Sequence, residues 1–225
     1  MVLLVNNTIL AVSPTNLAEF YSQYPRLLVG AKEMAGKAPL KVEPGGVLYV
    51  RQKQWAACHP GERLDSGEDV TACATEDLLT CHAVILRDPA TSVTAIGHFD
   101  EFSRHWDFSG LMEDFLDKVK LMKEKEDWDY CDSDCDGDWE WWDEADERDY
   151  NYNLQQGQSK QKRFHDKYIT FNILQDVVYE LHLLGGYADE AKRGHKLTQR
   201  FLKHLHDLPI RLEIVTCCLG PPNTK

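Results

Sequence analysis

The segment from Thr75 to Asp100 constrains the fold more than any other part of the sequence, because it reads as two apolar strands on either side of a turn. The turn is predicted at residues Asp88 to Thr91, where the sequence is DPAT. Proline presets φ at the second position of a β-turn, and the aspartate before it can accept hydrogen bonds from the turn backbone. The segment is therefore predicted to fold into an antiparallel hairpin.

The centre of the hairpin decides which side chains meet. A hairpin centred on the middle of the turn places Leu86 opposite Val93 and Cys81 opposite His98. Directly opposed residues share a face of the sheet, with Cβ atoms about 4.5 to 5.5 Å apart. Because successive side chains alternate between faces, His82 is expected to point the other way. The distant histidine, rather than the adjacent one, is the predicted partner of the thiol.

A thiol beside an imidazole is the minimum for nucleophilic attack on a carbonyl carbon, because the attacking species is the thiolate. Cys81 is the predicted nucleophile and His98 the predicted base. Backbone N–H groups at Thr80, Cys81 and His82 are candidates for an oxyanion hole, which would bring Thr80 and His82 against the substrate. The alternative is a buried structural cysteine beside a core histidine.

Five motifs carry a resemblance to a known family. They are GGVLYVRQ (45–52), TCHAVILR (80–87), GHFD (97–100), LHLLGGYADE (181–190) and KLT (196–198). In this order they resemble the protein N-terminal asparagine amidohydrolases, over residues 44–122 and 177–220. The spacing of Thr75, Cys81 and His98 is also similar to that in the chemoreceptor glutamine deamidases. In the resembling families a hydroxyl residue at the Thr75 position orients the histidine; the alternative is that Thr75 is a turn or cap residue.

The resemblance implies an α+β fold with a deamidase-like mixed β-sheet core, a catalytic hairpin and flanking helices. It also implies hydrolysis of the side-chain amide of an N-terminal asparagine to aspartate, with release of ammonia and without a cofactor or metal. The new N-terminal aspartate would enter the arginylation branch of the N-degron pathway. The expected partners are proteins or peptides with a free N-terminal asparagine, and the chain is expected to act as a monomer.

Selectivity for a free α-amine requires an anionic or carbonyl-lined subsite near Cys81. Asp100 is the predicted substrate-binding residue at this subsite, and Glu76 and Asp77 are also available. The sequence alone does not choose among the three carboxylates.

The net charge of −12 is concentrated in one segment. Residues 124–149 contain 14 Asp and Glu against Lys125 and Arg148, which sums to −12, so the remaining chain has 23 acidic and 23 basic residues. No basic patch survives this subtraction, and binding to nucleic acid is not expected. Residues 124–165 have no apolar period and are predicted to be a disordered acidic insertion, longer than the resembling amidohydrolases carry.

The acidic segment also contains a partial calcium-loop pattern from Asp132 to Asp143. Carboxylates at alternate positions, with a glycine at the sixth, suit a hard cation. Asp143 replaces the usual glutamate, however, and Cys135 is out of place, which weakens the match. A calcium-binding interaction protein stays open as an alternative function. Zinc binding through Cys131 and Cys135 is weaker, because no second ligand pair has metal spacing.

The seven cysteines are an odd number without the density of a disulfide scaffold, which favours a reducing, cytosolic or nuclear compartment. The apolar start has no basic region typical of a signal peptide, and no apolar run approaches the roughly 18 residues needed to cross a membrane. Members of the family are expected to continue past the last strand of this sequence. Because missing strands would expose a sheet edge, an inactive or truncated homologue that acts as a binding protein also stays open.

The chain is predicted to divide into the N-terminal part of a deamidase domain (1–123), the acidic insertion (124–165) and a β-α-β C-terminal part of the same domain (166–225). Further elements are expected from periodicity and from cap and turn residues. Strands are expected at Met1–Ala11, Val47–Val50, Tyr168–Ile173, Val177–Leu184 and Ile210–Cys218, and helices at Asn16–Val29, Ser109–Lys123 and Asp189–His206.

Overall fold

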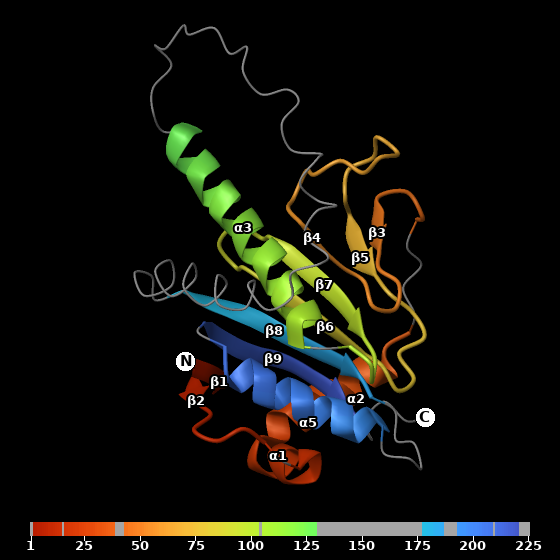
Figure 1. Ribbon diagram of the computed structural model, residues 1–225, viewed down its shortest axis with the longest axis vertical. Coiled ribbons are helices and arrows are strands. Elements are labelled where there is room, and N and C mark those ends of the chain that lie inside the picture. The colour runs from red at the N-terminus through yellow and green to blue at the C-terminus, as the bar shows by residue number, and fades with distance from the viewer. Residues whose placement is uncertain are drawn as a thin grey trace, which may run out of the picture.

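A computed structural model provides the structure of the protein and describes residues 2–14, 16–38, 43–103, 105–129, 177–186, 193–208 and 210–220. The strands are β1 (Val2–Val5), β2 (Thr8–Ile9), β3 (Val47–Tyr49), β4 (Trp55–Cys58), β5 (Ala72–Ala74), β6 (His82–Arg87), β7 (Thr94–Phe99), β8 (Val178–Gly185) and β9 (Arg211–Leu219). The helices are α1 (Leu17–Gln23), α2 (Pro25–Gly36), α3 (His105–Asp129) and α5 (Arg193–His206). Their arrangement in space is shown in Figure 1.

The main sheet is mixed and has the strand order β2-β1-β9-β8-β6-β7-β4. Its β1, β9 and β8 strands pair in parallel, whereas β6 is antiparallel to both β8 and β7. β3 and β5 form a separate parallel pair. The expected α+β class with a mixed sheet is confirmed, and so is the parallel pairing of the two strands of the C-terminal β-α-β unit.

The hairpin predicted between Thr75 and Asp100 forms, but its register differs from the prediction. Leu86 pairs with Ala95, rather than with Val93, and Ala83 pairs with His98. The prediction that Cys81 lies directly opposite His98 is therefore wrong by two residues. An even shift keeps every side chain on its expected face, because the faces of a strand alternate with a period of two.

A wider loop explains the shift in register. The Asp88 carboxylate accepts hydrogen bonds from the Ala90 and Thr91 N–H groups and from the Thr91 hydroxyl. Ser92 adopts a φ of 59°, and the Asp88 N–H donates to the Val93 carbonyl oxygen. The connection is thus closed by Asp88 and Val93, and the turn proline lies inside a four-residue loop instead of a two-residue turn.

The two faces of the hairpin are covered by different parts of the chain. On one face, the Phe99 ring lies 5.8 Å from Phe108 of α3 and 5.3 Å from Phe201 of α5, measured between ring centroids. Figure 1 shows both helices in front of the sheet. The other face carries His98, and the segment that follows β5 reaches it through Thr75. β6 is buried on both faces, which explains why its sequence is an almost unbroken apolar run.

Several other helices and strands differ from those expected from the sequence. The first expected strand is split into β1 and β2 at Asn6 and Asn7, which have φ values of 53° and 58°. The expected helix from Asn16 is divided because Pro25 begins a second helix at its first turn. Helix α3 begins before Ser109 and ends after Lys123, at Asp129, so the prediction of a disordered insertion from residue 124 is wrong for residues 124–129. The strand expected at Tyr168–Ile173 and the candidate calcium loop lie outside the described residues.

Within the described ranges, no helix is both long enough and apolar enough to cross a lipid bilayer.

Helix α1 is tied to the sheet by one buried hydroxyl, which allows a test of the fold. The Tyr21 hydroxyl lies 2.9 Å from the Cys217 carbonyl oxygen and accepts a hydrogen bond from the Leu219 N–H at 3.1 Å. In Tyr21→Phe these groups lose their partner, and we expect the free energy of unfolding to fall by about 1 to 3 kcal/mol. Urea denaturation would measure this as a lower midpoint with an unchanged slope.

Tyr24→Phe is the matched control for this prediction. The Tyr24 ring packs on Phe20 at 5.2 Å, and its hydroxyl has no partner among the described residues. Its removal should change stability by less than about 0.5 kcal/mol. Equal effects of the two substitutions would contradict the assignment.

Candidate active site

Cys81 lies immediately before β6. The turn that follows β8 packs against the backbone of Cys81. The Cys81 carbonyl oxygen accepts a hydrogen bond of 2.9 Å from the Gly186 N–H. Gly185 has a φ of 110°, and a Cβ at this position would lie 2.2 Å from the same oxygen. The GG motif is thus explained by contact: only glycine lets this turn pack against the backbone of the cysteine. Cys81 keeps 8% of its surface exposed.

His98 lies on β7 and is oriented by a hydroxyl. Its Nδ1 is 2.8 Å from the Thr75 Oγ1, and the residue is 3% exposed. The buried Nε2 has no hydrogen-bond partner among the described residues. In the tautomer that carries its proton on Nδ1, the ring donates to Thr75 and presents the Nε2 lone pair as a proton acceptor.

Strand alternation relates the cysteine to the histidine. Ala83 is directly opposite His98, and Cys81 precedes Ala83 by two residues, so the two side chains share a face. Cys81 is therefore diagonal to His98. Diagonal neighbours on adjacent antiparallel strands are about 7 to 8 Å apart at the backbone, within reach of a long side chain. The structure thus brings Thr75 into contact with His98 and leaves Cys81 one diagonal step away.

The surroundings favour the neutral forms of both groups. Burial raises the pKa of the Cys81 thiol, and the negative charge of Asp100 raises it further, against a hydrogen bond with the Thr80 side chain. Burial lowers the pKa of His98, although Asp100 and Asp77 act in the opposite direction. At neutral pH the site is therefore a thiol and an uncharged imidazole, and the imidazole is free to accept a proton.

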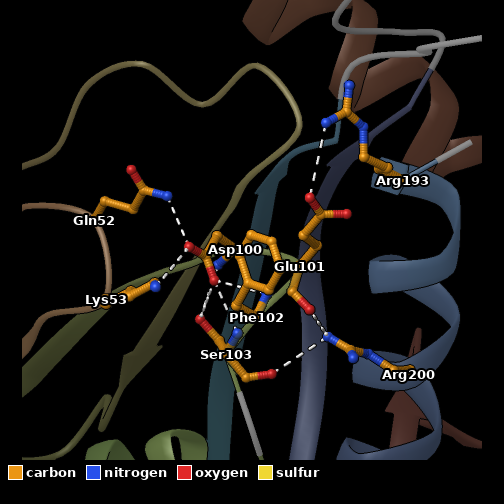
Figure 2. Close-up of polar contacts among 8 residues, drawn as sticks. All are labelled: Gln52, Lys53, Asp100, Glu101, Phe102, Ser103, Arg193 and Arg200. Carbon is orange, nitrogen blue, oxygen red and sulfur yellow. Dashed lines mark hydrogen bonds and ion pairs between the residues drawn. The ribbon is translucent and has the colours of Figure 1, made fainter. Parts of the chain in front are cut away.

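Asp100 follows β7 and holds the turn at residues 100–103. Its Oδ1 accepts hydrogen bonds from the Phe102 N–H and the Ser103 N–H. Its Oδ2 accepts 2.7 Å from the Gln52 side chain and lies 3.6 Å from the Lys53 ammonium. Burial alone would raise the pKa of Asp100, but these hydrogen bonds and the Lys53 charge lower it. Figure 2 shows both carboxylate oxygens occupied by donors of the chain itself.

The other two predicted substrate-binding residues lie beside the cysteine. Thr80 interacts with the Cys81 thiol, and its backbone N–H and that of Cys81 donate no hydrogen bond among the described residues. The His82 side chain points to the opposite face, as strand alternation predicts, where its Nε2 lies 2.7 Å from the Thr198 Oγ1 of α5. Burial lowers the pKa of His82 to about 3. Any contact of His82 with substrate would involve its backbone.

Several residues that support the site were missed by the sequence reasoning. Arg200 of α5 donates to the Glu101 carbonyl oxygen at 2.9 Å and to the Ser103 carbonyl oxygen at 3.3 Å, and Arg193 lies 3.7 Å from the Glu101 carboxylate. Figure 2 shows how these arginines connect α5 to the turn after β7. The partners are about a hundred positions apart in sequence, and no local motif marks them.

Across the described ranges, no group of three or more His, Cys, Asp or Glu side chains is arranged to hold a metal ion.

The fold and the site together define a class: an α+β protein with a mixed sheet, in which a cysteine and a histidine that is hydrogen-bonded to a threonine hydroxyl share one face of a central β-hairpin. Comparison with known sequences identifies the family within this class. The model of the family described as Protein N-terminal asparagine amidohydrolase matches residues 37–129 and 166–225, and the chain belongs to this family.

Curated relatives share the name of the family. The chain is 21% identical to the protein N-terminal asparagine amidohydrolase of Sus scrofa over 214 residues and 22% identical to that of Mus musculus over 212 residues. The enzyme of Homo sapiens is 21% identical over 212 residues. Each comparison covers 94% of this chain and 50% of the relative, so the chain spans about half the length of the curated relatives it matches.

The electrostatics of the site predict how the reactivity of Cys81 depends on pH. The rate of alkylation by iodoacetamide follows the thiolate fraction, and its midpoint should lie above the ordinary cysteine value of about 8.5. Asp100→Asn removes a negative charge that raises the pKa of Cys81, and the midpoint should move to lower pH. Mass spectrometry of the Cys81 peptide after timed alkylation would measure both curves.

Asp65→Asn is the control for general charge effects, because Asp65 lies in the exposed loop between β4 and β5. Its curve should coincide with that of the wild type. A midpoint that stays fixed or rises in Asp100→Asn would contradict the electrostatic description of the site.

Proposed function

We propose that the chain hydrolyses the side-chain amide of an N-terminal asparagine in proteins or peptides, producing aspartate and ammonia. The observation that carries the proposal is the hydrogen bond between Thr75 and His98, on the face of the hairpin that also bears Cys81, in a chain of this family. The names of the curated relatives supply the substrate. The bond fixes the imidazole so that one nitrogen remains available for the thiol.

The first half of the reaction forms a thioester. His98 Nε2 takes the proton of the Cys81 thiol as the sulfur attacks the carboxamide carbon of the substrate. The C=O double bond opens, and the oxygen becomes an oxyanion. When the C=O bond reforms, the C–N bond breaks, and the proton held by His98 leaves with the nitrogen as ammonia. Thr75 keeps the ring in place while the imidazole gains and loses this proton.

The second half restores the enzyme. His98 Nε2 takes a proton from a water molecule as the water oxygen attacks the thioester carbon. The C–S bond breaks, the sulfur receives the proton, and the substrate side chain leaves as a carboxylic acid. The net change is one water consumed and one ammonia released.

Backbone donors at the start of β6 stabilise the oxyanion in this proposal. The Thr80 and Cys81 N–H groups donate no hydrogen bond among the described residues, so they are available to a substrate oxygen. Donors that are fixed in place before the reaction stabilise the transition state because little reorganisation is needed. Cys81 is fixed by Gly186, and His82, the next residue, is fixed by Thr198.

We assign recognition of the free α-ammonium group to Asp77. Asp100 uses both oxygens within the chain, and Glu76 accepts a hydrogen bond from the Tyr49 hydroxyl. Asp77 is exposed, adopts a φ of 56° in the segment between Thr75 and Cys81, and lies near enough to His98 for its charge to act on the imidazole. Of the two exposed carboxylates, Glu76 and Asp77, Asp77 is the one whose charge acts on His98.

The proposal extends to the cellular role. The product of the reaction is a protein with an N-terminal aspartate, which is the kind of residue that the arginylation branch of the N-degron pathway recognises. We place the activity in the cytosol or nucleus, because a reactive thiol stays reduced there. We also propose that the chain works as a monomer.

The assay uses peptides that begin with asparagine. The wild type should release ammonia, with a mass gain of about one dalton, which is the difference between an amide and an acid. Cys81→Ala should lower kcat by at least about a thousandfold, because it removes the nucleophile. Thr75→Val keeps the shape of the side chain but removes the hydroxyl, and kcat should fall by about tenfold or more.

Peptides that begin with glutamine or aspartate serve as substrate controls, and circular dichroism checks that each variant is folded. Activity that survives Cys81→Ala would remove the proposed mechanism. A folded wild type without activity on any asparagine peptide would remove the proposed function.

The role of Asp77 is tested with two substrates: a peptide with N-terminal asparagine, and the same peptide with the α-amine replaced by hydrogen. Asp77→Asn should raise KM for the first by about tenfold, because a hydrogen-bonded charge pair is lost, and leave KM for the second unchanged. Steady-state kinetics with both peptides measure the difference.

Glu76→Gln is the matched control, since it removes the adjacent carboxylate and should leave the preference for the free amine intact. An active enzyme whose preference is unchanged in Asp77→Asn would overturn this assignment without touching the proposed reaction.

A further inference from the structure

Two cysteines outside the candidate active site face each other across the gap between the two sheets. Cys58 ends β4 in the main sheet and Cys73 is the middle residue of β5 in the small sheet. Their Sγ atoms are 3.5 Å apart. Cys58 is buried and Cys73 is half-buried, so the pair can be approached from the side of Cys73. The 15-residue separation in sequence gave no indication of this contact.

A lysine on α3 gives the pair a distinct electrostatic environment. The Lys118 ammonium donates to the Ala57 carbonyl oxygen at 2.9 Å and to the Glu62 carboxylate at 2.7 Å, next to Cys58. The pKa of Cys58 is lowered by the hydrogen bond with Cys73 and by Lys118, against the effects of burial and Glu62. The pKa of Cys73 is raised by the same hydrogen bond and by burial. Either sulfur can donate the hydrogen bond between the two cysteines, and the Lys118 ammonium beside Cys58 favours Cys58 as the nucleophile.

We propose that Cys58 and Cys73 are an oxidation site, which a peroxide converts to a disulfide that links β4 to β5. The Cys58 sulfur attacks one peroxide oxygen, the O–O bond breaks, and with hydrogen peroxide a sulfenic acid and one water result. The Cys73 sulfur then attacks the sulfenic sulfur, the S–O bond breaks, and a second water leaves. Two thiols and one hydrogen peroxide give one disulfide and two waters, and an added thiol reverses the change.

The position of the pair links its oxidation state to the segment that supports His98. Cys73 precedes Thr75 by two residues, and Cys58 pairs with Thr94 on β7, the strand that carries His98. A disulfide would close a ring from residue 58 to residue 73 and join the two sheets at this point. It removes conformational freedom from the open forms of this region, so the strand that leads to Thr75 should open less often.

The experiment uses the full chain with Cys81→Ala, because trypsin leaves Cys73 and Cys81 in one peptide, 64–87, and places Cys58 alone in 54–63. The protein is treated with hydrogen peroxide, denatured, alkylated and digested. We expect peptides 54–63 and 64–87 to appear joined, two daltons lighter than the sum of the separate reduced peptides. The joined species should disappear after treatment with dithiothreitol.

The rate of amide hydrogen exchange provides a second measurement on the same protein. The amides of residues 73–75 should exchange at least about threefold more slowly after oxidation, and return to the original rate after reduction. Cys58→Ser in the same background is the matched control, and it should show neither the linked peptides nor the slower exchange. Peptide 212–225, which contains Cys217 and Cys218, should be alkylated equally before and after treatment.

Alkylation of both cysteines after peroxide treatment, or their conversion to sulfinic acids without a link, would overturn the proposal. A link that involves any other cysteine would do the same. None of these outcomes bears on the proposed hydrolysis, because the background protein lacks Cys81.

Discussion

The pairing of β6 with β7 on one side and β8 on the other is the constraint on which the candidate site depends. It places Ala83 opposite His98 and His82 opposite Gly185, and so sets the face on which each of these side chains lies. A slip of one residue would exchange the faces, because the side-chain period of a strand is two. Such a slip would also move the charged Arg87 to the face that the helices cover, where burying a charge costs free energy. The burial of β6 on both faces therefore favours the observed register.

The two faces of β6 contribute differently to the site. The helix-covered face holds the backbone rigid: His82 bonds to Thr198, and the glycine turn after β8 bonds to Cys81. The other face carries the two titratable side chains of the candidate site, Cys81 and His98. Cys81, immediately before the central strand β6, is thus held in a fixed position and shares a face with His98; in the proposed mechanism this arrangement supplies the preorganisation that catalysis requires.

The parts of this arrangement that depend on short-range rules could be predicted from the sequence. Alternation alone placed His82 away from the thiol, and the turn residues located the hairpin. The register could not be predicted, because it depends on how the Asp88 side chain folds the loop around itself and widens it by two residues. The support of the turn at Asp100 by Gln52 and Arg200 could not be predicted either. Those contacts join segments far apart in sequence, and no periodicity describes them.

The charges around the site connect the charge of the substrate's α-amine with the protonation of the Cys81 thiol. Without substrate, burial raises the pKa of Cys81 and the charge of Asp100 raises it further, so the resting sulfur is protonated. In the proposed binding mode an α-ammonium group arrives beside Asp77 and brings a positive charge into the same field. A nearby cation favours the thiolate and offsets the effect of the carboxylates. An acetylated peptide brings no such charge, and the nucleophile would stay neutral. The free amine would thus serve both recognition and activation, which gives a physical reason for a site of this kind to act on chain termini.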